Sequence, residues 1–248
     1  MIERIDDGEV AILRLAHGPV NALDADLCEA VAAQFRALVT DPARAVVVTG
    51  SGRAFSAGAD LRRVVEEGEP YVRRFVPSLD DLFRSVFELG KPVVAAVNGH
   101  AIAGGCVLAA CADVTLMSAG RIGVPELAVG VPFPRVALEV LRHAVGDAVT
   151  RKLVLGTQTY PADEARSLGL VDEVPAADDL LPSAVARARA LTASIPSDTF
   201  AATKAQLRRD AVERMATYAD EAESVTTLWI RRVEDGWTRR YLDAVTRK

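Results

Sequence analysis

Short hydrophobic runs alternate with amphipathic stretches over the first two thirds of the chain. The runs are rich in branched side chains, which favour strands, and lie at Val10–Leu15, 45–49, 93–97 and 113–117. Hydrophobic residues at helical spacing follow Asp24, a capping residue, to about Val39, and recur over residues 71–89. A segment rich in small residues, 104–111, is also expected to be helical. Strands that alternate with helices predict a parallel sheet with crossover connections, so the expected fold class is α/β.

The pattern becomes almost wholly helical after about Pro134. The exception is a short strand signal at Gly169–Val174. We therefore expect an α/β core over residues 1–195 and a helical carboxy-terminal segment over residues 196–248. The boundary is expected in the sequence Ser194-Ile195-Pro196-Ser197, where serine and proline interrupt the pattern.

Composition narrows the class of protein. The chain has 248 residues, of which 50% are hydrophobic and 25% charged, as in an ordinary globular domain. These values exclude a disordered tail, a collagen-like repeat and a small disulfide scaffold. The net charge of −5 comes from 29 basic and 34 acidic side chains, which are interleaved along the chain. No basic face is dense enough to bind nucleic acid through its phosphates, so no nucleic-acid partner is expected.

Cysteine usage and the longest apolar stretch bear on location. The three cysteines, Cys28, Cys106 and Cys111, have no metal-binding spacing and lie among apolar residues, which favours buried neutral thiols and no metal site. The amino terminus shows no secretion signal. The longest uncharged apolar stretch, Ala101–Ala112, is shorter than the roughly 20 residues that cross a bilayer. The expected location is therefore the cytoplasm, with no membrane partner.

Four segments differ from ordinary core sequence. Each has a purely structural explanation, namely a tight turn, close helix packing, a solvent-facing acid or a helix cap. For the acid, Glu126, the structural explanation is the weakest, because its neighbours are apolar. Burial among them would raise the pKa of its carboxyl toward the range useful for proton transfer. The segments are SGRAFSAGADL (51–61), NGHAIAGGCVL (98–108), RIGVPELAVGVPFP (121–134) and NALDADL (21–27).

Taken in chain order, these segments resemble the crotonase superfamily, also called the enoyl-CoA hydratase/isomerase family. GRAFSAGADL is similar to the family's first oxyanion-hole loop, and KPVVAAVNGHAIAGGCVLAACAD (91–113) to its second. IGVPELAVGV is similar to the loop that carries a catalytic acid. The resemblance continues through GTQTYPADEARSLGLVDEV (156–174) and therefore covers essentially the whole chain. It implies a crotonase-like spiral of ββα units with a helical carboxy-terminal trimerisation segment.

The resemblance also implies roles for individual residues. It assigns the oxyanion hole to the backbone N–H groups of Ala59 and Gly104, and the catalytic acid to Glu126. Two preorganised donors stabilise the enolate charge that develops on a thioester oxygen, each by about 2.7–4 kcal/mol of barrier. A β-branched side chain at Gly104 is expected to block the substrate, and one at Ala103 to be milder. The residues implied in substrate binding are Ala57, Ala59, Asp60, Leu61, Arg62, Gly104, Val107 and Pro125.

One position departs from the family's hydratase pattern. Hydratases of this family use two glutamates, and the first of these positions is Val107 in this chain, while the second is Glu126. Adding water requires one group to deprotonate the water and another to deliver a proton to carbon. The related 3-enoyl-CoA to 2-enoyl-CoA isomerases have an apolar residue at the first position and a single glutamate at the second, as here. The leading expectation is therefore an enoyl-CoA isomerase of fatty acid metabolism.

Two other functions stay open at this point. One is a different crotonase reaction, such as hydration, a lyase step or hydrolysis, with Asp60, Glu139 or His100 as a replacement acid. The other is a catalytically silent protein that binds acyl-CoA. A dinucleotide-binding enzyme lacks support because no GxGxxG follows the first strand. The expected ligand is an acyl-CoA thioester, with coenzyme A as part of the substrate and no other cofactor, and the expected assembly is a homotrimer or a dimer of trimers.

Overall fold

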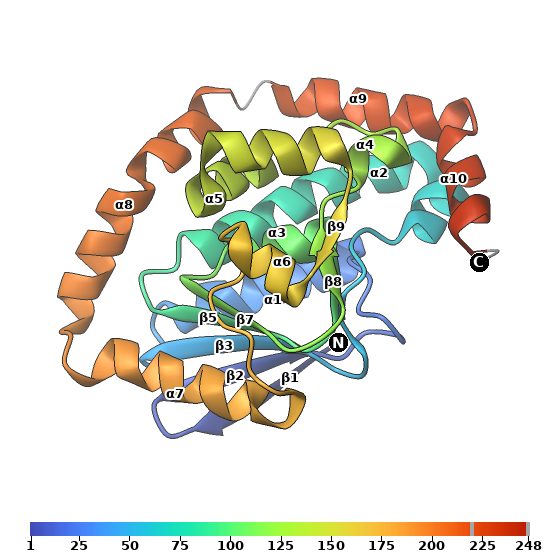
Figure 1. Cartoon of the computed structure of the whole chain (residues 1–248). Helices are drawn as coiled ribbons and strands as arrows, with labels where there is room; N and C mark the ends of the chain where they lie inside the picture. Colours follow the sequence, from blue (N-terminus) through green and yellow to red (C-terminus); the bar gives the residue numbers. More distant parts are fainter. Residues whose placement is uncertain (219–220, 247–248) are drawn as a thin grey trace.

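The computed structural model describes residues 1–218 and 221–246, and its strands form two sheets (Figure 1). The larger sheet has the strand order β1-β2-β3-β5-β7, and the smaller has the order β4-β6-β8-β9. The strands are β1 (Ile2–Asp7), β2 (Val10–Leu15), β3 (Ala45–Gly50), β4 (Ala54–Ser56), β5 (Val93–Val97), β6 (His100–Ile102), β7 (Val114–Met117), β8 (Arg121–Gly123) and β9 (Thr159–Pro161).

The chain winds as a spiral of ββα units. Each turn gives one strand to the larger sheet, the next strand to the smaller sheet, and then a helix. The turns are β3-β4-α2, β5-β6-α3 and β7-β8-α4, so the predicted fold class is confirmed. The helices are α1 (Ala25–Leu38), α2 (Leu61–Phe87), α3 (Gly104–Ala110), α4 (Glu126–Val129), α5 (Arg135–Gly156), α6 (Ala162–Ser167), α7 (Leu180–Ala193), α8 (Ser197–Thr217), α9 (Glu221–Glu234) and α10 (Trp237–Thr246), with a single 3₁₀ turn at Ala177–Asp179.

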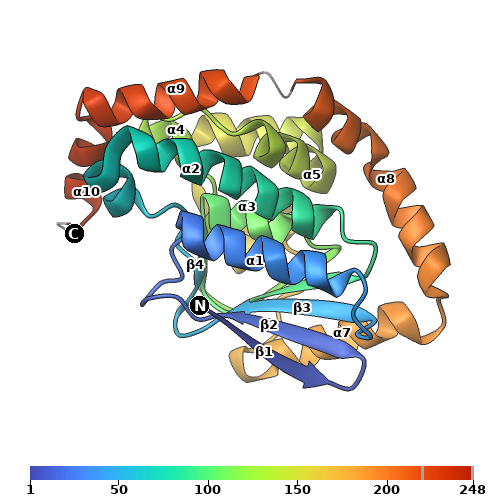
Figure 2. The ribbon, with the colours of Figure 1, turned by 180° about the vertical axis from the view of Figure 1, so that it is seen from behind.

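Branched residues in the central strands are buried on both sheet faces. In β3, Val46 and Val48 pack into the main core together with α1 and α2, whereas Ala45 and Val47 contact α7 on the opposite face. Figure 2 shows α1 and α7 on the two sides of the sheet. Since side chains alternate along a strand, a strand covered on both faces must be apolar at every position, which is the AVVV pattern seen in the sequence.

The carboxy-terminal helices return to the body of the same chain. Helix α8 runs along one edge of the molecule in Figure 1, beside α5, and α9 then lies across α2. Helix α10 contacts α2 and α4 as well as α9. The segment after residue 195 thus covers the region of α4, where Glu126 lies. The division into 1–195 and 196–248 and the trimeric state stay predictions.

Most elements expected from the pattern are present, with one correction. The helix expected over residues 71–89 is present as the second part of α2, whose two helical parts meet at a kink at Gly68 (φ +68°, ψ −149°). The strand signal at 169–174 is wrong, since that segment makes only one bridge, between Leu116 and Glu173. None of the described helices is long and apolar enough to cross a membrane. The three cysteines are free and buried as predicted, and burial raises the pKa of Cys111 to about 12.

Candidate active site

The first glycine-rich loop runs from the end of β4 into α2. Gly58 has a φ of +80°, a conformation that L side chains rarely adopt, and a Cβ there would lie 2.6 Å from the carbonyl oxygen of Ile102. Ala59 pairs with Leu23 as an isolated parallel bridge. Among the described residues, the Ala59 amide has no hydrogen-bond acceptor, so it is free to donate to a ligand.

The second glycine-rich loop connects β6 to α3 and lies against the first. Ala103 has a φ of +53°, and its amide donates to the carbonyl of Gly123 over 2.8 Å. Gly104 is the first residue of α3, so its N–H has no partner inside the helix, and none elsewhere in the described chain. A Cβ on Gly58 would lie 3.3 Å from the Gly104 nitrogen, so the two loops touch.

Glu126 begins α4, a single turn that follows Pro125, ends at Val129 and is capped by Gly130. Its side chain is buried, and the Oε2 atom has no hydrogen-bond partner among the described residues. Burial raises the pKa of this carboxyl to about 8, because the charged form loses its hydration without gaining an ion pair. A carboxyl with such a pKa can both accept and return a proton near neutral pH.

Ala59, Gly104 and Glu126 line one small cavity. Its other lining residues are apolar and come from four helices and from the loops, and they include Val107, which is fully buried. The cavity volume is about 20 Å³, room for one water molecule. The structure therefore brings the three predicted catalytic groups together around a small, mostly apolar space. The remaining lining residues are Leu79, Phe83, Ala103, Pro134, Ala137 and Trp229.

The other residues predicted to bind substrate lie outside this cavity. The Ala57 amide is bonded to the Val20 carbonyl, and Asp60 caps α2 by accepting from the amides of Arg62 and Arg63. Leu61 is half-buried against the core, and the Arg62 side chain is exposed. Contact of these residues, and of Pro125, with a coenzyme A arm stays a prediction.

None of the three replacement acids reaches the cavity. Asp60 serves as a helix cap, and His100 is exposed on β6. Glu139 is fully buried in α5, where it accepts from Arg142 over 2.8 Å and from Arg214 over 2.6 Å. No group of three or more His, Cys, Asp or Glu side chains in the described chain is arranged to hold a metal ion.

Trp229 is one of the lining residues that were not predicted from the sequence. It lies in α9, more than 100 positions after Glu126, and packs edge-on against Phe75 of α2 with ring centroids 5.9 Å apart. The hydrophobic spacing of α9 could have indicated a packed face. It could not indicate that this face returns to Glu126 rather than to a neighbouring chain.

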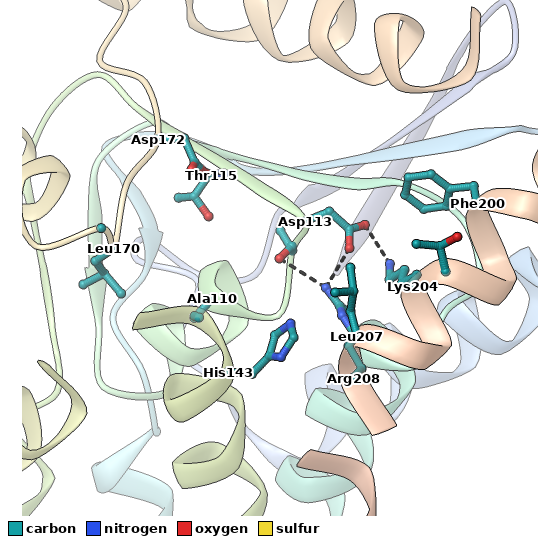
Figure 3. A pocket seen from close by; sticks show the side chains of 14 residues that line it. Ala110, Asp113, Thr115, His143, Leu170, Asp172, Phe200, Lys204, Leu207 and Arg208 are labelled. Carbon is teal, nitrogen blue, oxygen red and sulfur yellow. Dashed lines mark hydrogen bonds and ion pairs between the residues drawn. The ribbon is translucent and has the colours of Figure 1, made fainter. Parts of the chain in front are cut away.

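A larger cavity elsewhere holds a group of charged side chains (Figure 3). Three of these charged side chains, Asp113, Lys204 and Arg208, are paired with one another. Asp113 accepts from Lys204 and from Arg208, each over 2.7 Å, and also from the amide of Val93. Arg208 reaches the carbonyls of Phe87 and Cys111, near the ends of α2 and α3. The cluster therefore joins α8 to the core.

Replacing Asp113 by alanine should destabilise the fold strongly. The change leaves Lys204 and Arg208, both about 95% buried, without their anion. Breaking a buried pair in this way typically costs about 3–5 kcal/mol. Urea unfolding of Asp113→Ala measures the loss. Asp81→Ala is the control, because its ion pair with Arg36 is exposed and such pairs contribute little. Equal midpoints for the two variants would contradict this interpretation.

Comparison with known proteins places the chain in a family. The family model described as "Enoyl-CoA hydratase/isomerase" matches residues 6–235. The chain belongs to the enoyl-CoA hydratase/isomerase family. A putative enoyl-CoA hydratase of Thermus thermophilus is 37% identical over 201 residues, which are 78% of this chain and 79% of that protein.

Solved structures of the enoyl-CoA hydratase/isomerase family have the same fold. A Mycobacterium tuberculosis protein named an enoyl-CoA isomerase in one structure has a TM-score of 0.78 at 26% identity, over 94% of this chain and 97% of that one. A second structure of the same protein, named there a probable enoyl-CoA hydratase, has a TM-score of 0.82 at 29% identity, over 90% and 94%. The human mitochondrial delta3-delta2-enoyl-CoA isomerase has a TM-score of 0.88 over 99% and 96%, at 22% identity, which bears on the fold alone. Most curated relatives carry hydratase names. Membership of this family identifies the chain as an acyl-CoA enzyme, but it does not determine which reaction the enzyme catalyses.

Proposed function

We propose that this enzyme moves the double bond of a 3-enoyl-CoA to give the 2-enoyl-CoA. The observation that carries the proposal is the lining of the cavity. Glu126 is the only carboxylate among the described residues that line it, and Val107 occupies the position of the hydratases' other glutamate. In this proposal coenzyme A is part of the substrate, and no other cofactor takes part.

The reaction needs one base and one oxyanion site. Ionised Glu126 takes a proton from the α carbon, and the electrons of that C–H bond delocalise onto the thioester oxygen as a dienolate. The amides of Ala59 and Gly104 donate hydrogen bonds to this oxygen, and each is worth about 2.7–4 kcal/mol of barrier. Glu126 then returns the proton to the γ carbon. One carboxyl completes the cycle and no water is consumed.

Hydration is the second candidate, because most of the relatives' names favour it. It requires a bound water to be deprotonated while carbon is protonated, and family hydratases divide these tasks between two carboxylates. The apolar wall formed by Val107 offers neither a base nor a hydrogen bond to such a water. We therefore expect hydration of 2-enoyl-CoA to be slower than isomerisation by orders of magnitude.

Separate incubations with 3-enoyl-CoA and 2-enoyl-CoA test the proposal. The expected result is conversion of the first to the second, with little 3-hydroxyacyl-CoA from either. Hydration as fast as isomerisation would overturn it. The proposal also includes a homotrimer or a dimer of trimers in the cytoplasm, and sedimentation velocity tests the assembly.

The pH dependence should follow the ionisation of Glu126. Since the base must be ionised and burial raises its pKa to about 8, kcat/KM should rise with pH up to about 8 and then level off. The folded-state pKa lies above the unfolded value of 4.5, so ionisation opposes folding. Stability should therefore fall as pH rises from about 4.5 to 8, and this loss should be absent in Glu126→Gln. A profile of kcat/KM that is flat from pH 6 to 9 would be inconsistent with Glu126 as the base.

A further inference from the structure

Leu23 holds the first oxyanion loop through its main chain. Its amide donates to the Gly58 carbonyl over 2.8 Å, and its carbonyl accepts from the Asp60 amide over 2.9 Å. These two bonds flank Ala59 on both sides. Because the anchors lie at the neighbouring residues, the Ala59 amide is held in place while it stays free to donate.

The side chain of Leu23 holds the second loop. It is fully buried, and its Cδ1 atom lies 2.9 Å from the position that a Cβ on Gly104 would take. The next atoms around that position, on Phe83 and Leu79, are 3.6 and 3.7 Å away. One residue therefore contacts both amide-bearing loops, the first through its backbone and the second through its methyl group.

The segment that carries Leu23 is fixed at its amino-terminal side by Asn21. Asn21 is fully buried with a φ of +50°. Its side-chain Nδ2 donates to the Ala54 carbonyl over 2.9 Å, and its main-chain carbonyl accepts from the Ser56 hydroxyl over 2.8 Å. The same hydroxyl accepts from the Gly58 amide. Asn21 thus joins this segment to β4 and to the start of the first loop.

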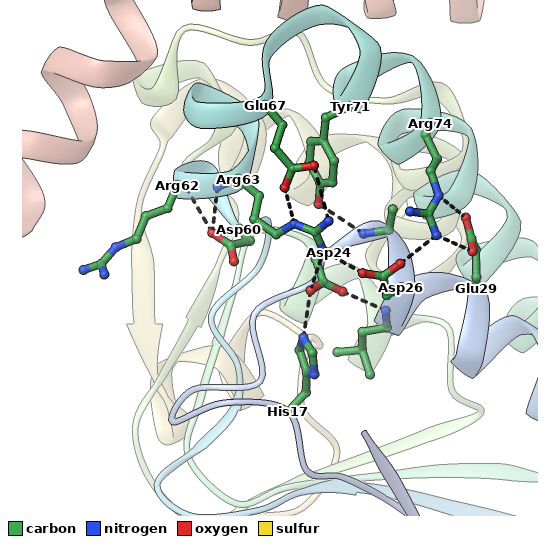
Figure 4. A network of polar contacts seen from close by, with 12 residues as sticks. His17, Asp24, Asp26, Glu29, Asp60, Arg62, Arg63, Glu67, Tyr71 and Arg74 are labelled. Carbon is green, nitrogen blue, oxygen red and sulfur yellow. Dashed lines mark hydrogen bonds and ion pairs between the residues drawn. The ribbon is translucent and has the colours of Figure 1, made fainter.

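Asp24 fixes the other side of the segment, as Figure 4 shows. Its carboxylate caps α1 at the Leu27 amide and also contacts His17 over 2.8 Å and Arg63 over 3.1 Å. Arg63 lies in the first turn of α2, directly after the loop, and pairs with Asp26 as well. The starts of α1 and α2 are therefore tied together around Leu23.

We propose that Leu23 is a positioning residue that sets the spacing between the Ala59 and Gly104 amides. The inference rests on the proposed function, since it concerns the oxyanion hole of that reaction. Donors stabilise a developing charge only when they are held in place before it forms, within about half an ångström. The loops also touch directly at Gly58, and Leu23 adds a second connection, because it contacts both of them. Its loss should therefore lower kcat more than it weakens binding of the substrate.

The first test compares two buried leucines. Leu23→Ala should lower kcat at least about tenfold, toward the hundredfold typical of losing one oxyanion donor, with KM changed by less than about threefold. Leu27→Ala is the matched control, because Leu27 is equally buried, but its amide donates to the Asp24 carboxylate and its side chain is not among the three nearest to a Cβ on Gly104. It should destabilise the fold with kcat near the parent's. Leu23→Met keeps the volume and should restore kcat to within about threefold of the parent's. Equal kcat losses in the two alanine variants would overturn the proposal.

The second test needs no catalysis. In the parent, Gly104→Ala places a methyl against Leu23, whereas in Leu23→Ala that space is open. Thermal unfolding of the two single variants and the double variant should show coupling, with Gly104→Ala less harmful in the Leu23→Ala background. Additive changes in Tm would overturn the contact. If the parent does not turn over 3-enoyl-CoA, the proposed function is wrong. The coupling between the two Tm changes still shows whether the Leu23 side chain contacts Gly104.

Discussion

Replacing Glu126 by glutamine should lower kcat by about 10²–10⁴-fold, the usual effect of losing a general base. Glutamine keeps the size and polarity of the side chain but cannot take a proton from the α carbon. The affinity for acyl-CoA should change little, because Glu126 forms no ion pair with any residue that the structure describes and only the reacting carbon depends on its charge. Steady-state kinetics and direct binding of a saturated acyl-CoA measure the two effects.

Glu139→Gln is the control for burial of a carboxylate. Glu139 is also fully buried, but its partners are Arg142 and Arg214 and it does not line the cavity. Its replacement should lower stability and leave the kcat of the folded enzyme near the parent's. If Glu126→Gln turned over substrate as fast as the parent, Glu126 would not be the base. If the protein instead only binds acyl-CoA without catalysis, Glu126→Gln and Glu139→Gln should bind acyl-CoA equally well and the parent should show no turnover.

Gly104→Val should leave the chain folded and reduce kcat by at least about 10²-fold, the effect of losing one oxyanion donor. The backbone of Gly104 is not in the left-handed region, so valine is restricted by space rather than by φ. Its Cβ would lie 2.9 Å from Leu23, and its methyl groups would occupy the cavity beside Glu126. Kinetics together with acyl-CoA binding separates loss of the donor from simple blockage.

The control for this variant differs from the one the sequence indicates. From the sequence, Ala103→Val is expected to be milder than Gly104→Val, but Ala103 has a φ of +53°, where a β-branched residue is strained, so it makes a poor control. Gly156→Val is the better control, since Gly156 ends α5 with no atom within 4 Å of a new Cβ. Parent-like turnover by Gly104→Val would show that the Gly104 amide is not the donor.

The long elements could be predicted from the sequence because their patterns are local. Val46 and Val47 face two different layers, and a run of branched residues signals that directly. The three-residue strands of the smaller sheet could not be predicted, since strands such as Ala54–Ser56 are too short to show a period. The strand prediction at 169–174 was wrong because Leu170 and Val171 are apolar for burial in the core, while the segment pairs with β7 at one bridge only.

Some residues of the candidate site could likewise be predicted from the sequence, and others could not. Glu126, Ala59 and Gly104 could be located because their segments have distinctive compositions, and the departure at Val107 could be read at a single position. Trp229 could not, because its place at the cavity depends on how α9 returns across α2. The positioning role proposed for Leu23 could not be predicted, because the simplest explanation of the segment that contains it was a helix cap. That cap is present at Asp24, and it is one part of a larger arrangement.

One labelling experiment tests most directly the claim that a single buried carboxyl moves a proton without adding water. The enzyme is given 3-enoyl-CoA that carries deuterium at the α carbon, in water enriched in oxygen-18, and the product is analysed by mass spectrometry. We expect 2-enoyl-CoA without oxygen-18, part of it with deuterium at the γ carbon. Oxygen-18 in most of the product would contradict it. So would failure to convert 3-enoyl-CoA while 2-enoyl-CoA, supplied separately, gains the label.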